Sequence, residues 1–121
     1  MATGVPHHLY VVKFSDGVVK VGYTGNLKAR LRAHRTDARS RGARATHYWA
    51  SEEYGRQLAQ QGERALIAWC AERWPRAWGS EYFAGADAQA IALYAADVED
   101  ELFAAEYAMC RAEQKGDPQV A

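Results

Sequence analysis

The sequence is poor in cysteine. Its 121 residues include two, Cys70 and Cys110, which lie far apart and show no Cys-x-x-Cys spacing. This pattern argues against a disulfide framework and against a cysteine-based zinc site. Both cysteines lie within stretches of helical periodicity, where a free cysteine usually behaves as a small hydrophobic residue. We therefore expect two buried free thiols.

The sequence also lacks a long apolar run. No stretch reaches the roughly 20 apolar residues that a membrane-spanning helix requires. Residues 1–8 do not show the basic and then apolar pattern of a signal peptide, so we expect a cytoplasmic protein without a membrane partner. The length predicts a single domain spanning 1–121, which is too short for a catalytic domain and a separate recognition domain.

A net charge is missing as well, because 15 Lys and Arg balance 15 Asp and Glu. The charges are unevenly distributed: residues 1–50 hold nine basic and two acidic side chains, a net charge of +7, and the remainder carries −7. Such a local excess attracts polyanions, although a solvated surface is the alternative interpretation. The residues that we assign to nucleic-acid binding are Lys28, Arg32, Arg35, Arg39, Arg41 and Arg44.

Two short strands are predicted near the start of the chain. Residues 9–14 and 18–23 are rich in β-branched and aromatic side chains, and the Ser-Asp-Gly sequence between them is typical of a hairpin loop. If Gly17 takes the left-handed conformation of a three-residue loop, Tyr10 and Lys20 lie on one face of the sheet. A two-residue turn would instead place Tyr10 and Lys20 on opposite faces.

Three helices are predicted from the spacing of apolar residues. The first can be capped by Thr24 or Asn26, and it carries Arg30 and His34 four residues apart, on the side that we expect to face the hairpin. We therefore predict an α+β fold, in which a small three-stranded antiparallel sheet is flanked by helices and a long C-terminal helix follows. The predicted ranges are 27–39, 52–73 and 88–113 for the helices and 47–49 for the third strand.

A set of short motifs occurs in a fixed order along this fold. LYVV is followed by KVGYT, then by an arginine eight residues after the glycine and a histidine four residues further on. A downstream helix contains GERALIAW, and GSEYF follows it. The set resembles the GIY-YIG endonuclease family, whose phage-type branch closes with a GEWF-like element. The resemblance covers about residues 8–84 and implies a three-stranded antiparallel sheet flanked by helices.

The resemblance implies a role for each of five residues. Tyr10 would act on the attacking water, Arg30 would hold the scissile phosphate, and Glu63 would hold a single divalent metal, Mg²⁺ or alternatively Mn²⁺. These types suit phosphodiester hydrolysis, because a guanidinium and a hard cation together stabilise the negative charge that grows in the transition state. His34 would bond the phosphate or the water. Lys20 would position the nucleophile or lower the pKa of Tyr10.

The sequence departs from the family pattern at three places. His8 stands where the first motif usually has glycine, Lys20 stands where the second usually has tyrosine, and the late polar asparagine has no clear counterpart, with Ser80 or Glu81 as substitutes. Structural alternatives also exist for single residues: Tyr10 could be a strand aromatic, and His34 could be a packed histidine.

We predict a metal-dependent endonuclease that hydrolyses phosphodiester bonds in DNA. Its catalytic residues would be Tyr10, Lys20, Arg30, His34 and Glu63, with Glu63 also the metal ligand. DNA is the expected partner, and a second copy of the chain is a further candidate. Two alternatives have the same fold: a nucleic-acid-binding module with weak or no cleavage, and a protein-interaction domain that uses the acidic C-terminal helix.

Overall fold

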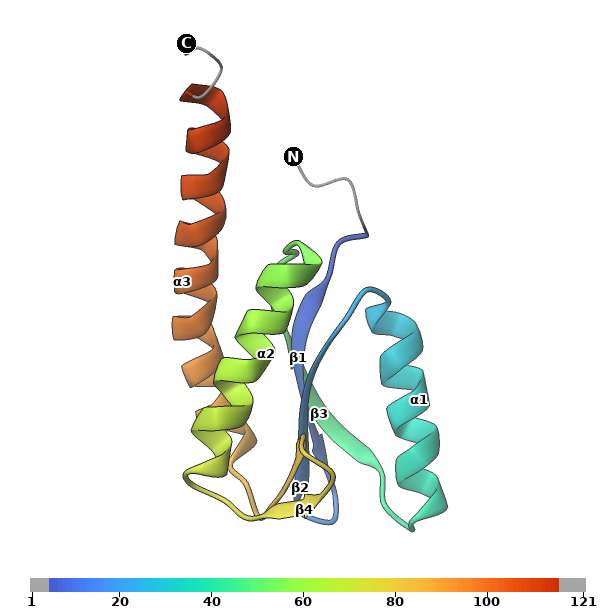
Figure 1. The fold of residues 1–121 in the computed structure, drawn as a ribbon. Coiled ribbons are helices and arrows are strands. Elements are labelled where there is room, and N and C mark those ends of the chain that lie inside the picture. Colours follow the sequence, from blue (N-terminus) through green and yellow to red (C-terminus); the bar gives the residue numbers. More distant parts are fainter. Residues whose placement is uncertain (1–4, 116–121) are drawn as a thin grey trace.

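The computed structural model describes residues 5–115, which form one five-stranded antiparallel sheet and three helices (Figure 1). The strand order across the sheet is β3-β1-β2-β5-β4. In chain order the elements are β1 (His8–Phe14), β2 (Val18–Thr24), α1 (Leu27–Ser40), β3 (Ala45–Ala50), α2 (Arg56–Ala71), β4 (Arg76–Trp78), β5 (Tyr82–Ala84) and α3 (Ala88–Lys115).

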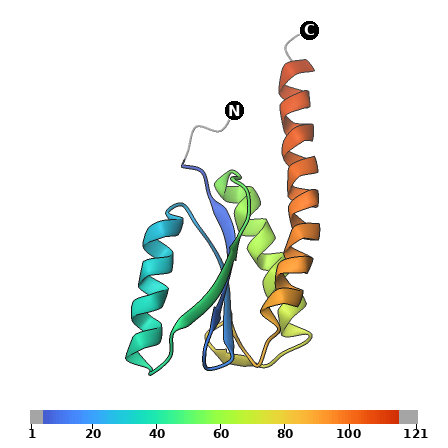
Figure 2. The ribbon, with the colours of Figure 1, turned by 180° about the vertical axis from the view of Figure 1, so that it is seen from behind.

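The helices cover the two faces of the sheet unequally. Figures 1 and 2, which view the molecule from opposite sides, show α1 on one face and α2 with α3 on the other. Side chains alternate along the strands, so Tyr10 and Val12 pack under α1, whereas Leu9 and Val11 pack under α2 and α3. The result is two hydrophobic layers that share the central strands β1 and β2.

The β1–β2 hairpin has the predicted register. Tyr10 lies opposite Gly22, and Val12 lies opposite Lys20. Gly17 adopts a φ of 86°, the left-handed conformation that favours glycine in a three-residue loop. Tyr10 and Lys20 therefore share one face of the sheet.

The fold is α+β with a long C-terminal helix, but the prediction of a three-stranded sheet is wrong, because β5 and β4 extend the sheet beyond β2. β5 pairs with β2 at Val18, Val19 and Lys20, and β4 pairs with β5. Each added strand has three residues, too few to show the alternation of a strand, and the flanking Pro75 and Gly79 are typical of loops. β4 and β5 are strands because β5 hydrogen-bonds to β2, which lies far from it in the sequence, and β4 hydrogen-bonds to β5.

The helix boundaries follow local capping. Asn26 caps α1, because its side chain accepts a hydrogen bond from the backbone N–H of Ala29 at 3.1 Å. The predicted start of the second helix at Glu52, with Ser51 as its cap, is wrong. Ser51 instead accepts a hydrogen bond from the Leu9 N–H at 2.9 Å, and α2 begins four residues later. That bond ties the segment before α2 to β1.

Cys70 is buried, as expected, but Cys110 is exposed, so the prediction of two buried thiols is half wrong. Cys110 follows Leu102, the last core residue of α3 in the described part of the chain, and Phe103 directly after Leu102 is already 64% exposed. Within residues 5–115, no helix combines the length and apolar character needed to cross a membrane.

Candidate active site

A tyrosine and a histidine form a buried pair between the sheet and α1. The hydroxyl oxygen of Tyr10 lies 2.8 Å from Nε2 of His34, and the two side chains are 2% and 4% exposed. The His34 ring also meets the rings of Phe14 and Tyr82 edge-on. α1 therefore brings a titratable ring onto the sheet face that carries Tyr10.

Burial keeps both members of this pair neutral near pH 7. It raises the pKa of the Tyr10 phenol above its ordinary value of 10, and Tyr82, Glu81 and Glu63 act in the same direction against the opposing charge of Arg30. Burial, together with Lys20 and Arg30, lowers the pKa of His34 to about 4. A neutral imidazole can accept the phenolic proton, whereas an imidazolium could not. Neighbouring cations therefore do not suffice to make Tyr10 a phenolate.

Gly22 leaves the space that the Tyr10 hydroxyl occupies. A Cβ built on Gly22 would lie 2.7 Å from this oxygen, closer than real Cβ contacts come. The glycine of the KVG motif is thus required by the ring of the residue opposite it on β1. It keeps the phenol in place beneath the backbone of β2.

Lys20 lies on the same sheet face and forms an ion pair with Glu81, from the turn before β5. Its ammonium group also lies 5.0 Å from the centre of the Tyr82 ring. The lysine side chain is 8% exposed and that of Glu81 is 35% exposed, so the carboxylate connects a buried cation to the surface. Sequence reasoning named Glu81 only as a substitute for the late asparagine, because nothing local predicts that β5 pairs beside Lys20.

Glu63 reaches this region from α2. A Cβ on the preceding Gly62 would lie 2.8 Å from Leu9 and 3.0 Å from Leu102, so the glycine allows α2 to pack closely. Glu63 is half-buried, and its pKa is raised by burial and by the negative charge of Glu81, while Lys20 opposes the shift. The negative charge of Glu81 and the positive charge of Lys20 therefore act on Glu63 in opposite directions.

Arg30 completes the group of predicted catalytic residues. It lies one turn before His34 on α1 and is exposed, so that its guanidinium can meet a ligand in solution. Its charge nevertheless acts on both Tyr10 and His34. The five residues predicted from the sequence come from β1, β2, α1 and α2, and the charges of Arg30 and Glu63 act on Tyr10; we call the five the catalytic cluster, after the role predicted for them. The structure adds Glu81 to it.

Two carboxylates of this region could serve as ligands for a divalent cation. Residues 5–115 contain no group of three or more His, Cys, Asp or Glu side chains arranged to hold a metal. Glu63 and Glu81 offer two carboxylates, and Mg²⁺ in phosphoryl-transfer sites commonly binds through one or two carboxylates together with water and substrate phosphate. The donors fit a cation that binds with an anionic substrate, and they do not fit an all-protein cage.

Of the six residues assigned to nucleic-acid binding, all except Arg41 are exposed. Arg41 donates from Nε to Asp16 at 2.9 Å, and its guanidinium carbon lies 4.6 Å from the ring centre of Phe14 and 4.8 Å from that of Trp78. Arg41 therefore joins the end of α1 to the hairpin loop and to β4. Its positive charge is already engaged within the fold.

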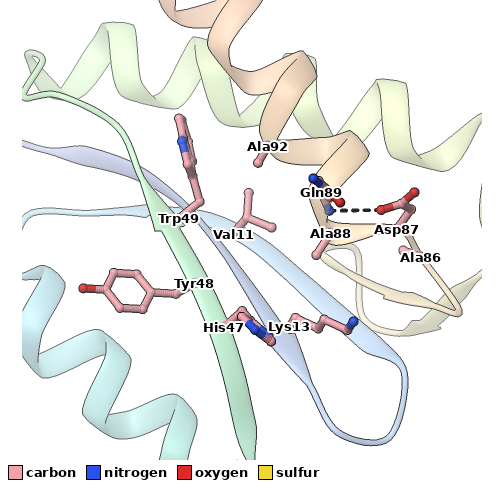
Figure 3. A pocket seen from close by; sticks show the side chains of 10 residues that line it. All are labelled: Val11, Lys13, His47, Tyr48, Trp49, Ala86, Asp87, Ala88, Gln89 and Ala92. Carbon is pink, nitrogen blue, oxygen red and sulfur yellow. Dashed lines mark hydrogen bonds between the residues drawn. The ribbon is translucent and has the colours of Figure 1, made fainter.

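A cavity of about 500 Å³ lies on the opposite face of the sheet, between β3, β1 and the start of α3 (Figure 3). Trp49 and Val11 form its apolar wall, and the Asp87 carboxylate at its rim accepts the N–H of Gln89. No residue of the catalytic cluster lines it. The other lining residues are Lys13, His47, Tyr48, Ala86, Ala88 and Ala92.

Comparisons of the chain with protein-family models, with curated proteins and with solved structures give no match.

Proposed function

We propose that the chain is a metal-dependent endonuclease that hydrolyses phosphodiester bonds in DNA, as its resemblance to the GIY-YIG family implies. One observation carries this proposal. Tyr10, Lys20 and His34 are buried on one face of the sheet, and the charges of the exposed Arg30 and the half-buried Glu63 act on Tyr10. Polar and titratable groups that converge within a hydrophobic layer, where their burial is costly, favour a chemical role over a purely structural one.

Arg30 would bind the scissile phosphate. Its guanidinium is exposed, remains charged at any physiological pH and can contact two phosphate oxygens at once. The same group stands near the Tyr10–His34 pair. A phosphate bound to Arg30 would therefore lie beside the hydroxyl that orients the water.

Tyr10 and His34 would handle the proton of the attacking water. As the water oxygen bonds to phosphorus and one P–O bond breaks, the water proton would pass to the Tyr10 oxygen, and the phenolic proton would pass to Nε2 of His34. This relay suits a phenol with a raised pKa, because Tyr10 need never exist as a free phenolate. The neutral state of His34 near pH 7 leaves Nε2 able to accept.

Glu63 would hold the divalent cation, Mg²⁺ or alternatively Mn²⁺, with Glu81 as the neighbouring carboxylate. A bound cation would supply positive charge to the phosphate and to the departing oxygen. It would also relieve the repulsion that raises the pKa of Glu63. Lys20 would keep Glu81 in place at the edge of β2.

A plasmid-nicking assay with and without Mg²⁺ tests this function. Wild-type protein should nick only with the metal, and Glu63→Gln should abolish nicking while DNA affinity in a filter-binding assay changes by no more than a few-fold. Glu53→Gln, on an exposed side chain before α2, is the matched control and should nick normally. Wild-type nicking by Glu63→Gln would refute the metal assignment.

A binding module without cleavage is the second candidate, and the burial of Tyr10 favours it. A hydroxyl on a side chain that is 2% exposed is almost completely shielded from water. This candidate predicts filter binding of DNA without nicking at any metal concentration. Absence of both binding and nicking would favour a protein-interaction domain.

A further inference from the structure

Four basic residues form a row along α1. Lys28, Arg32, Arg35 and Arg39 follow one another at intervals of four, three and four residues, and all are exposed. At about 100° per residue, their side chains fall within about 60° of one another around the helix axis. We call this row the outer stripe. Arg41 is not part of it, because its guanidinium is held by Asp16.

The outer stripe faces away from the catalytic cluster. By the same helical geometry, Arg30 projects about 170° from the middle of the stripe. The electrostatics agree, because the basic groups that act most strongly on Tyr10 and His34 are Lys20, Arg30 and Arg41, and none belongs to the stripe. One helix therefore presents an arginine to the cluster and four cations to the other side.

The chemistry of the stripe suits a phosphodiester backbone. The stripe spans twelve residues, so about 16 Å of helix axis separates Lys28 from Arg39, which matches about five successive phosphates of one DNA strand. The exposed residues between the cations are the small Ala29, Ala33 and Thr36, together with Arg30 and Asp37, which project about 170° from the middle of the stripe, so a backbone can approach the stripe closely. None is aromatic, which favours a duplex over unstacked single-stranded bases.

The acidic α3 of a second copy is a weaker occupant. The helix α3 carries the large apolar side chains Leu93, Phe103 and Tyr107, which are 69%, 64% and 56% exposed. Protein interfaces bury such groups against apolar partners, and the outer stripe offers none of comparable size. Charge alone would hold that contact together.

We propose that the outer stripe of α1 binds the backbone of a duplex DNA segment that is separate from the segment at the catalytic cluster. Only the DNA segment at the catalytic cluster depends on the proposed function; the segment at the stripe does not. A chain with two DNA surfaces would hold two segments, or two turns of one bent segment, on opposite sides of α1. Binding at the stripe would be independent of sequence, because its contacts are to phosphates.

Salt dependence tests the stripe without any cleavage. Four phosphate contacts predict a slope of about −3.6 in log affinity against log salt, or about a 150-fold loss of affinity between 50 and 200 mM salt. Replacing all four residues with Gln should remove this contribution, measured by anisotropy of a labelled duplex without metal. A charge-preserving control, with Arg32, Arg35 and Arg39 each changed to Lys, should retain it. Arg30→Gln should change the slope by no more than about one.

Stoichiometry separates the stripe from the catalytic cluster. With duplexes of about 12 bp, which are longer than the roughly five phosphates that the stripe spans, wild-type protein should bind two duplexes per chain and the four-Gln variant one. A different result would support the stripe and refute DNA binding at the catalytic cluster: wild type binds one duplex per chain, the four-Gln variant binds none, and Arg30→Gln binds normally.

Three results would overturn the stripe. An unchanged slope and stoichiometry in the four-Gln variant would make it a solvated surface. One shared duplex, with non-additive losses from the four-Gln change and Arg30→Gln, would make it part of a single surface. A change in sedimentation mass without a change in slope would identify a second copy as its occupant, and tighter binding of a single strand than of a duplex would contradict the choice of duplex.

Discussion

Acid should destabilise the fold through His34. Its side chain is 4% exposed, and burial with the nearby Lys20 and Arg30 lowers its pKa from 6.5 to about 4. A histidine with a lower pKa in the folded chain takes up a proton more readily after unfolding, so protonation favours the unfolded state. The stability contributed by neutral His34 is fully present above pH 6.5 and is lost as the pH falls towards 4.

The magnitude follows from the difference between the two pKa values. It corresponds to about 3 kcal/mol in total, of which about 2 kcal/mol should be lost by pH 5. Urea unfolding at pH 7.5 and pH 5 measures this loss for wild type and for His34→Gln, whose amide can still bond the Tyr10 hydroxyl but does not titrate. Wild type should lose about 2 kcal/mol more than the variant between the two conditions.

Comparison of variants isolates His34 from the carboxylates that also titrate in acid. His47→Gln, on an exposed side chain, is the matched control and should retain the full wild-type loss. A second measurement is the proton NMR titration of the His34 ring in the folded protein. Equal losses in wild type and His34→Gln, or a ring that titrates near 6.5, would refute the buried pair with Tyr10.

Three further substitutions test the packing around the cluster by urea unfolding. Tyr10→Phe leaves Nε2 of His34 buried without its partner and should lower the free energy of unfolding by about 1–3 kcal/mol. Cleavage should fall about 10²-fold or more. Unchanged stability would contradict the hydrogen bond. Gly22→Ala should lower the free energy of unfolding by about 1–3 kcal/mol, because its Cβ would meet the Tyr10 hydroxyl. Gly55→Ala, with open space around it, is the control and should lower it by less than about 1 kcal/mol. Equal losses would argue against the close contact. Arg41→Gln should lower the free energy of unfolding by about 1 kcal/mol, because it removes the ionic and aromatic contacts of the guanidinium. An unchanged free energy of unfolding would show that these contacts do not stabilise the fold.

The sequence predicts the local parts of this molecule well. The hairpin register follows from Gly17 and from the alternation of side chains, which places Tyr10 and Lys20 on one face. The position of His34 towards the sheet follows from helical spacing. These features depend on residues that are close in the chain, where turn chemistry and periodicity decide the structure.

The parts that sequence reasoning missed depend on distant contacts. β4 and β5 are too short for a periodic signal and exist because β2 offers them an edge. The partner of Lys20 was missed for the same reason, since Glu81 is brought to it by that pairing. The opposite orientations of Arg30 and the outer stripe could have been derived from helical spacing alone, but a charge count treats all cations of α1 as one group.

The ion pair between Lys20 and Glu81 also has a consequence for the time at which the cluster forms. The two residues are 61 positions apart in the chain, whereas the hairpin that carries Lys20 can form from a few neighbouring residues. During synthesis from the N-terminus, β1, β2 and α1 emerge before α2 supplies Glu63 and before β5 closes the sheet. A nascent chain therefore holds the tyrosine, the histidine and the arginine before it holds either carboxylate. Assembly of the cluster is complete only when the sheet is complete, and a chain interrupted before residue 63 has the cationic half alone.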